Sequence, residues 1–74
     1  MFYNRDMNKF AKRLKILRTE AGISRAKLAE EINVSARLVA YLENGQRKCD
    51  FDTLICLSKF FETSTDYLLG KTEY

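Results

Sequence analysis

Histidine and proline are absent from this 74-residue sequence, which contains only three glycines and two cysteines. Cys49 and Cys56 alone are too few ligands for a zinc site, so we expect no metal. Without histidine or a glycine-rich phosphate loop, the chain also lacks the side chains and motifs that most enzyme active sites are built from. We therefore expect no enzyme activity and no cofactor. The cysteines are expected to be free thiols in a reducing compartment, with a redox switch as the alternative.

Long apolar runs are also missing. The N-terminal residues 1–6 are too polar for the core of a signal peptide, and no run approaches the roughly 18 apolar residues of a membrane span. The sequence therefore predicts a cytoplasmic protein that does not bind a membrane. The length allows one domain, residues 1–74, with its core over about residues 8–70.

Charge is unevenly distributed along the chain. Residues 1–48 contain eleven Lys or Arg and five Asp or Glu, whereas residues 49–74 contain two and five. The net charge is therefore +6 over residues 1–48 and −3 over residues 49–74. This asymmetry favours a polyanion facing one end of the domain, although a solvated basic helix produces the same composition.

The hydrophobic pattern predicts an all-α chain, because no segment alternates polar and apolar residues for long. Phe10, Leu14, Leu17 and Ala21 form one face of a first helix over residues 8–21. Further helices are expected over residues 25–32, from the cap Ser35 to Glu43, from a cap at Asp50 or Asp52 to about Phe61, and over residues 65–69. In the fourth, Leu54, Leu57 and Phe61 are expected to be buried, with Phe51 and Ser58 beside them.

The segments between these helices contain typical capping residues. Gly22 is expected to end the first helix, and Ser24 is expected to cap the second. Asn33 is expected to adopt a left-handed conformation between the second helix and the cap Ser35 of the third.

Residues 24–44 therefore predict two short helices joined by a tight turn. The small Ala29 allows the helices to pack closely, and the inward residues are Leu28, Ile32, Val34, Val39 and Leu42. The outer face of the second helix of the pair contains Ala36, Arg37, Ala40 and Tyr41. This arrangement is typical of a helix-turn-helix, in which the second helix lies in the DNA major groove.

At this point the chain resembles the phage-repressor and Cro type of helix-turn-helix proteins, also called the xenobiotic-response-element family. The resemblance covers about residues 10–70. It is carried by residues 14–18, 22–24, 27–30, 34–35, 39, 41–45, 54, 57, 60–61 and 64–70. It implies a five-helix, lambda-repressor-like DNA-binding domain whose second and third helices form the helix-turn-helix. It further implies a bacterial or phage-encoded protein.

The resemblance also implies residue roles. Arg18 and Glu43 match a structural ion pair. Base contacts are implied for Ala36, Arg37, Ala40 and Tyr41, and phosphate contacts for Ser24, Arg25, Ser35, Asn44, Arg47 and Lys48. Among the base-facing residues, Arg37 is the strongest candidate because its guanidinium can bind both acceptors of a guanine.

Three positions depart from the family pattern. Arg25 stands where glutamine is usual, which favours a phosphate contact over support of a base-reading side chain. Leu38 replaces a small or hydroxylated residue and is expected to pack against Leu42, and Cys49 replaces a proline.

The sequence thus predicts a transcriptional regulator, most simply a repressor, that binds a double-stranded DNA operator as a homodimer. The alternative is a protein-interaction module, such as an antitoxin or anti-repressor partner, which the alanine-rich outer face favours. Phe60, Tyr67, Leu69 and Tyr74 are candidates for the dimer surface, although burial in the core explains most of them equally well.

Overall fold

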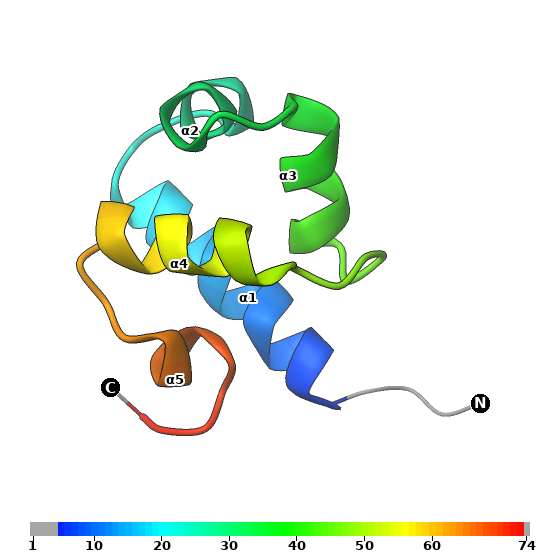
Figure 1. The fold of residues 1–74 in the computed structure, drawn as a ribbon, viewed down its shortest axis with the longest axis vertical. Coiled ribbons are helices and arrows are strands. Elements are labelled where there is room, and N and C mark those ends of the chain that lie inside the picture. The colour runs from blue at the N-terminus through cyan, green and yellow to red at the C-terminus, as the bar shows by residue number, and fades with distance from the viewer. Residues whose placement is uncertain (1–4, 74) are drawn as a thin grey trace.

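A computed structural model describes the backbone of residues 5–73 and the side chains of residues 9–73. Five helices and no strand make up this stretch of the chain, as the sequence predicts. They are α1 (Arg5–Glu20), α2 (Arg25–Ile32), α3 (Ala36–Glu43), α4 (Phe51–Phe60) and α5 (Thr65–Leu68). Figure 1 shows α2 and α3 at one end of the bundle, α1 and α4 crossing its middle, and α5 at the other end. None of the helices within residues 5–73 is both long and apolar enough to cross a bilayer.

Capping side chains determine where four of the helices begin. Ser24, Ser35, Asp50 and Ser64 each accept a hydrogen bond from the backbone N–H three residues later. Such a cap satisfies one of the four N–H groups that a helix leaves unpaired at its start. Of the two caps considered for α4, Asp50 is therefore the one used, and Asp52 lies in the first turn.

Residues with positive φ end the first two helices. Gly22 has φ +73°, and the N–H of Ile23 donates to the Arg18 carbonyl, so the chain reverses direction directly after α1. Asn33 has φ +63° at the end of α2, and the following Val34 N–H donates to the Ala29 carbonyl at 2.9 Å. These bonds satisfy the last carbonyls of each helix and fix the angle at which the next segment leaves.

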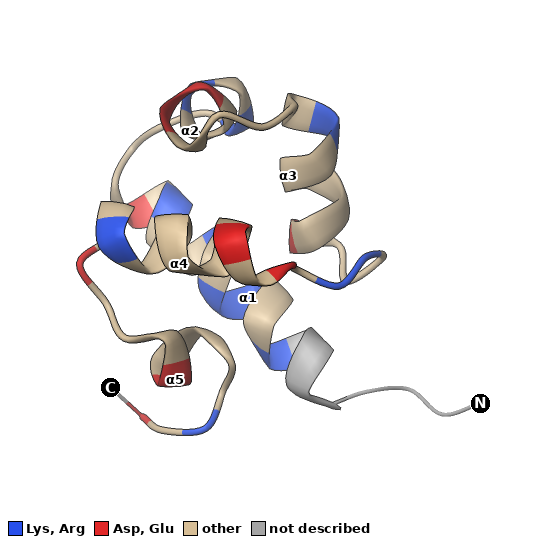
Figure 2. Ribbon diagram, in the orientation of Figure 1, with Lys and Arg blue, Asp and Glu red and all other residues tan. Residues whose placement is uncertain are grey.

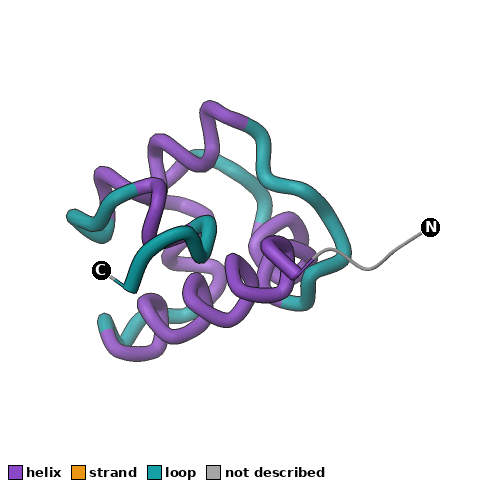
Figure 3. Tube along the Cα trace, turned by 90° about the horizontal axis from the view of Figure 1, so that it is seen from below, coloured by secondary structure: helices purple, strands orange, loops and turns teal. Residues whose placement is uncertain are grey.

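One fully buried leucine from each helix meets in the core. These residues are Leu14, Leu28, Leu42, Leu57 and Leu68. Their close packing in one cluster, together with Phe10 and Val39, holds the five helices in a fixed arrangement. The tube in Figure 3 shows the helices wrapped around this common centre.

Three expectations about burial were wrong or incomplete. Ala21 is exposed, because α1 ends at Glu20 and the chain turns away there. Phe61 is only half-buried, as the cap that follows α4. Phe51, expected beside the buried face of α4, is 82% exposed, because Thr53, Leu54 and Leu57 define that face and Phe51 lies outside it.

Arg13 ties the C-terminal segment to α1. Its Nη1 donates to the carbonyls of Tyr67 and Thr72, and its guanidinium lies 4.3 Å from the centre of the Tyr67 ring. Tyr67 and Leu69 are partly buried, and Leu69 packs against the core. Burial therefore accounts for these two candidates for a dimer surface, whereas Phe60 is 38% exposed and Tyr74 lies outside the described residues.

Candidate nucleic-acid interface

The helices α2 and α3 form a helix-turn-helix pair. They are joined by Asn33, Val34 and Ser35, and Val34 packs against the core between them. Ala29 lies at the same junction and is only 3% exposed, and its carbonyl accepts the hydrogen bond from the Val34 N–H. Figure 1 shows α3 along one edge of the bundle, with no other helix on its outer side. The predicted bounds of both helices agree with the structure.

Three charged residues hold α3 to α1 and to the start of α2. The Glu43 carboxylate at the end of α3 is fully buried, and its Oε1 accepts hydrogen bonds from Arg18 Nη2 at 3.1 Å and Arg25 Nε at 3.0 Å. Its Oε2 accepts from Arg18 Nε. Arg18 also donates to the Ile23 carbonyl at 2.8 Å, which fixes the turn before α2. We call Arg18, Arg25 and Glu43 the ion cluster.

The ion cluster shifts the pKa values of its members. Burial disfavours the charged form of Glu43, but the hydrogen bonds from Arg18 and Arg25 outweigh burial and lower the pKa of the Glu43 carboxyl. For Arg18, the hydrogen bond with Glu43 raises the pKa further above its ordinary value. Glu43 and Arg18 are therefore both charged at neutral pH, and the cluster of two arginines and one glutamate has one net positive charge. Arg25 carries this charge toward the surface, because its side chain is 40% exposed.

The contact between Arg25 and Glu43 was missed by sequence reasoning. The family pattern pairs Arg18 with Glu43, but glutamine rather than arginine is usual in the family at position 25. No helical spacing relates Arg25 to a residue on another helix 18 positions later. Only the packing of α2 against α3 brings them together. Nε of Arg25 binds Glu43, so its two terminal nitrogens remain for another anion.

The predicted base-facing residues lie on the outer side of α3. Ala36 and Arg37 are exposed, and Ala40 and Tyr41 are partly exposed. Arg37 is the only basic residue of α3, and the only acidic one, Glu43, is buried. Figure 2 accordingly shows basic residues at the start of α3 and in the loop that follows it.

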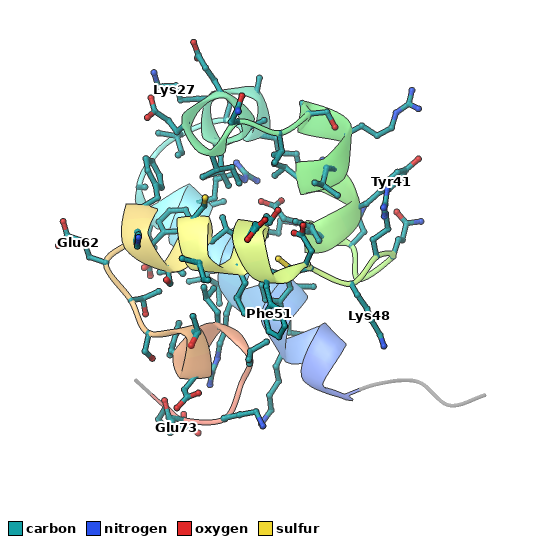
Figure 4. The ribbon with its side chains drawn as sticks, viewed as in Figure 1. Lys27, Tyr41, Lys48, Phe51, Glu62 and Glu73 are labelled. Carbon is teal, nitrogen blue, oxygen red and sulfur yellow. The ribbon has the colours of Figure 1, made fainter. Side chains whose placement is uncertain are left out.

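The predicted phosphate-facing residues border this side of α3. Ser24 and Ser35 are exposed, and each hydroxyl oxygen caps its helix, which leaves the O–H proton available to donate. Asn44, Arg47 and Lys48 are exposed in the segment between α3 and α4. In Figure 4, Tyr41 and Lys48 project from the same side of the molecule. The N-termini of α2 and α3 thus contribute partial positive charge along the edge of α3, and Arg47 and Lys48 in the loop contribute full positive charges.

Leu38 and Cys49 lie behind this loop. Leu38 packs against the core, and together with Val34, Leu42 and Cys49 it lines a small hollow of 280 Å³. Burial, and secondly the charge of Asp50, raises the pKa of the Cys49 thiol to about 12. Because the thiolate is the reactive form, Cys49 is poorly suited to a redox switch. Both cysteines are free thiols, and Cys56 is exposed. No group of three potential metal ligands gathers anywhere in the described residues.

Comparison with known proteins gives the same assignment along most of the chain. The family model described as helix-turn-helix matches residues 14–68. The chain is 44% identical over 62 residues to the HTH-type transcriptional regulator ImmR of Bacillus subtilis, covering 84% of this chain and 49% of ImmR. It is 34% identical over 64 residues to the HTH-type transcriptional activator BcrR of Enterococcus faecalis, covering 86% of this chain and 31% of BcrR. The chain thus spans half or less of these relatives' lengths.

Solved structures resemble the whole bundle. The P22 c2 repressor, in complex with a synthetic operator, matches with a TM-score of 0.81 at 27% identity, covering 85% of this chain and 96% of the repressor. The restriction-modification controller protein C.AhdI of Aeromonas hydrophila matches with a TM-score of 0.79 at 29% identity, covering 88% and 98%. A transcriptional regulator from Listeria innocua matches with a TM-score of 0.80 at 38% identity, covering 88% and 61%.

Proposed function

We propose that this chain, which belongs to the helix-turn-helix family, binds specific sequences in double-stranded DNA and thereby regulates transcription. The observation that carries the proposal is the outer side of α3. There Arg37 is exposed with no exposed acidic residue on its helix, and the ion cluster around the buried Glu43 carboxylate holds the helix in place. Similarity to a repressor crystallised with a synthetic operator supports the same conclusion.

In this proposal α3 lies in the major groove and reads the bases. Arg37 donates two hydrogen bonds to a guanine, and Ala36 and Ala40 contact thymine methyl groups or leave room for the bases. Tyr41 reaches a base edge or a phosphate from its partly exposed position. Because one arginine supplies most of the polar contacts, we expect strong discrimination at one base pair and weaker discrimination around it.

The phosphate contacts come from both sides of α3. Ser24 and Arg25 bind phosphate at the start of α2, Ser35 binds at the start of α3, and Asn44, Arg47 and Lys48 bind from the loop. In the ion cluster, Glu43 directs Arg25 through its Nε, so the position of the phosphate-binding nitrogens is coupled to the end of α3. Such contacts set the position of the protein on the duplex rather than its sequence preference.

Two copies are proposed to bind one operator. A single recognition helix contacts only a few base pairs, so a homodimer on a two-fold-symmetric site doubles the contacts. We propose repression as the outcome, because one of the solved structures that the chain resembles is a repressor in complex with a synthetic operator.

Selection of bound duplexes from a random DNA library tests the proposal. We expect recovery of a sequence with two inverted half-sites, about 10 base pairs apart from centre to centre, as two recognition helices on one face of the duplex require. If no sequence is enriched over the input library, sequence-specific binding is wrong.

Replacing Arg47 with alanine is expected to weaken binding by a similar factor on every duplex. A phosphate contact releases counterions whatever the base sequence, so its loss reduces the slope of log affinity against log salt by about 1. Lys71→Ala is the matched control, because it removes one exposed positive charge from the segment after α5. Binding titrations at several salt concentrations measure both slopes, and equal slopes for the two variants would contradict the role of Arg47.

A further inference from the structure

The hollow behind the loop between α3 and α4 has no part in the proposed DNA contacts. It has a volume of 280 Å³ and lies between α3, this loop and the first turn of α4. Small-molecule sites in proteins have volumes of about 300–1,000 Å³, so the hollow has the size of the smallest of them. We call it the loop hollow.

One side of the loop hollow is apolar. Val34, Leu38 and Leu42 line this side, and all three belong to the core cluster or pack against it. Leu38 stands where the family pattern has a small or hydroxylated residue, so this wall is more apolar than the pattern predicts. Because three aliphatic side chains offer no hydrogen bonds, the wall favours a hydrocarbon group over a polar one.

The other side of the loop hollow has a net positive charge. Arg47 and Lys48 line it, and none of the ion pairs found within residues 9–73 includes either of them. Asp50 also lines it, and hydrogen bonds with Thr53 lower the pKa of the Asp50 carboxyl, which is therefore ionised at neutral pH. The Cys49 thiol is neutral, since burial raises its pKa to about 12. Two positive charges and one negative charge leave one positive charge unbalanced.

We propose that the loop hollow binds a small carboxylate with an apolar body and that this ligand weakens DNA binding. The apolar body packs on the leucine-lined wall, and the carboxylate accepts hydrogen bonds from Arg47 and Lys48. Figure 4 shows Lys48 in the loop that leads into α4. A carboxylate suits Arg47 because a guanidinium can donate two parallel hydrogen bonds to its two oxygens. Its single charge also balances that of the site.

The volume of the loop hollow limits the size of this ligand. One water molecule takes up about 30 Å³ in the liquid, so 280 Å³ has room for roughly nine atoms other than hydrogen. Hexanoate is of this size and combines a flexible apolar body with one carboxylate. It is therefore a suitable probe.

The effect on DNA binding rests on the proposed function. Arg47 and Lys48 are proposed phosphate contacts, and a cation that binds a carboxylate is no longer available to a phosphate. A bound anion also cancels positive charge that attracts the duplex. Ligand and duplex should therefore weaken each other's binding by the same factor.

Titration with hexanoate in the absence of DNA tests the site. In amide NMR spectra at constant ionic strength, we expect saturable shifts concentrated at residues 34–42 and 47–53. Hexanamide has a similar apolar body without the charge, and acetate has the charge with little apolar body, so each should bind at least about tenfold more weakly. No saturable shift with hexanoate, or equal affinity for either control compound, would overturn the site.

Two variants with matched controls locate the bound probe. Arg47→Ala removes a donor to the carboxylate, and Lys71→Ala removes an exposed positive charge elsewhere. Leu38→Ser makes the apolar wall polar, and Ile16→Ser makes the same kind of change at an exposed position of α1. We expect Arg47→Ala and Leu38→Ser each to weaken hexanoate binding by roughly tenfold and the controls to bind normally. If Leu38→Ser lost the dispersed amide spectrum of a folded protein, Arg47→Ala would still decide. Equal affinity of Arg47→Ala and Lys71→Ala would overturn the assignment.

Competition with a selected operator tests the effect on DNA binding. Hexanoate at ten times its dissociation constant should lower the affinity for the operator by up to about elevenfold, the mass-action limit for full competition. Acetate at the same concentration should leave the affinity unchanged, and hexanoate should have much less effect on Arg47→Ala. An unchanged affinity of the unaltered chain in the presence of hexanoate would overturn the regulatory effect.

These outcomes are distinct from failure of the proposed function. If hexanoate binds at the loop hollow but the chain binds no duplex at low salt, the DNA-binding proposal is wrong and the ligand site stands. If hexanoate causes no saturable shift while the chain binds selected duplexes, the ligand site is wrong and the proposed function stands.

Discussion

Replacing Glu43 with alanine is expected to destabilise the fold by about 3–5 kcal/mol, the usual cost of removing one partner from a buried ion pair. The carboxylate is fully buried and accepts hydrogen bonds from both Arg18 and Arg25, so its loss leaves two guanidinium groups facing each other without a counter-charge. A domain of this length is stabilised by roughly 4–11 kcal/mol in total. Urea unfolding followed by circular dichroism should therefore show a much lower midpoint or an unfolded variant.

The matched control is Glu31→Ala. Glu31 forms an ion pair with Lys27 at 3.1 Å, but both side chains are substantially exposed on α2. Exposed pairs contribute at most about 1 kcal/mol, so this variant should unfold close to the unaltered chain. If Glu43→Ala were as stable as Glu31→Ala, the ion cluster would not hold α3 in place.

The same carboxylate predicts how stability depends on pH. The folded-state pKa of Glu43 lies below its unfolded value, because hydrogen bonds from Arg18 and Arg25 outweigh the burial that opposes ionisation. Its contribution is therefore complete above the unfolded pKa of about 4.3 and is lost as the pH falls through the folded pKa. Below pH 4 the free energy of unfolding should fall more steeply in the unaltered chain than in Glu43→Gln. Parallel curves for the two proteins would contradict this assignment.

Replacing Arg37 with alanine is expected to lower the affinity for a selected operator by about 1–3 kcal/mol, roughly 5- to 150-fold. The Arg37 side chain is exposed on α3 and does not pack in the core, so the substitution should not change the unfolding midpoint. The loss should be confined to the cognate site, because a base contact contributes little on random DNA. Competition titrations with operator and random duplexes measure the ratio.

A substitution of the contacted base pair serves as the control for Arg37. An operator in which that guanine is changed should bind the unaltered chain and Arg37→Ala equally well, whereas Arg47→Ala should be weaker on both operators. If Arg37→Ala discriminated between operator and random DNA as well as the unaltered chain does, Arg37 would not read a base.

Much of the fold could be predicted because its boundaries depend on short-range chemistry. Ser24 and Ser35 cap their helices as predicted, and α5 begins at the predicted residue 65. Asn33 adopts the predicted left-handed conformation, and Gly22 lies in the turn that follows α1. A cap bonds to a group three residues away, and so it is visible in the sequence. For the same reason the helix-turn-helix pair, which contains most of the candidate site, was the most predictable region.

The features that could not be predicted depend on how helices pack. Arg25 reaches Glu43 only because α2 and α3 cross beside α1, and no local pattern contains that contact. Phe51 is apolar and close in sequence to buried leucines, so periodicity alone suggests that it is partly buried. In the structure it lies outside the buried face of α4. Its exposure became visible only once the five helices were placed.

The measurement that tests the central claim most directly is an equilibrium titration of the chain with a selected operator and a random duplex across a range of salt concentrations. DNA binding through α3 and its flanking charges predicts affinity that falls steeply with salt on both duplexes. It also predicts binding at least about a thousandfold tighter to the operator than to random DNA. No binding to any duplex at low salt, or equal affinity for both, would contradict it.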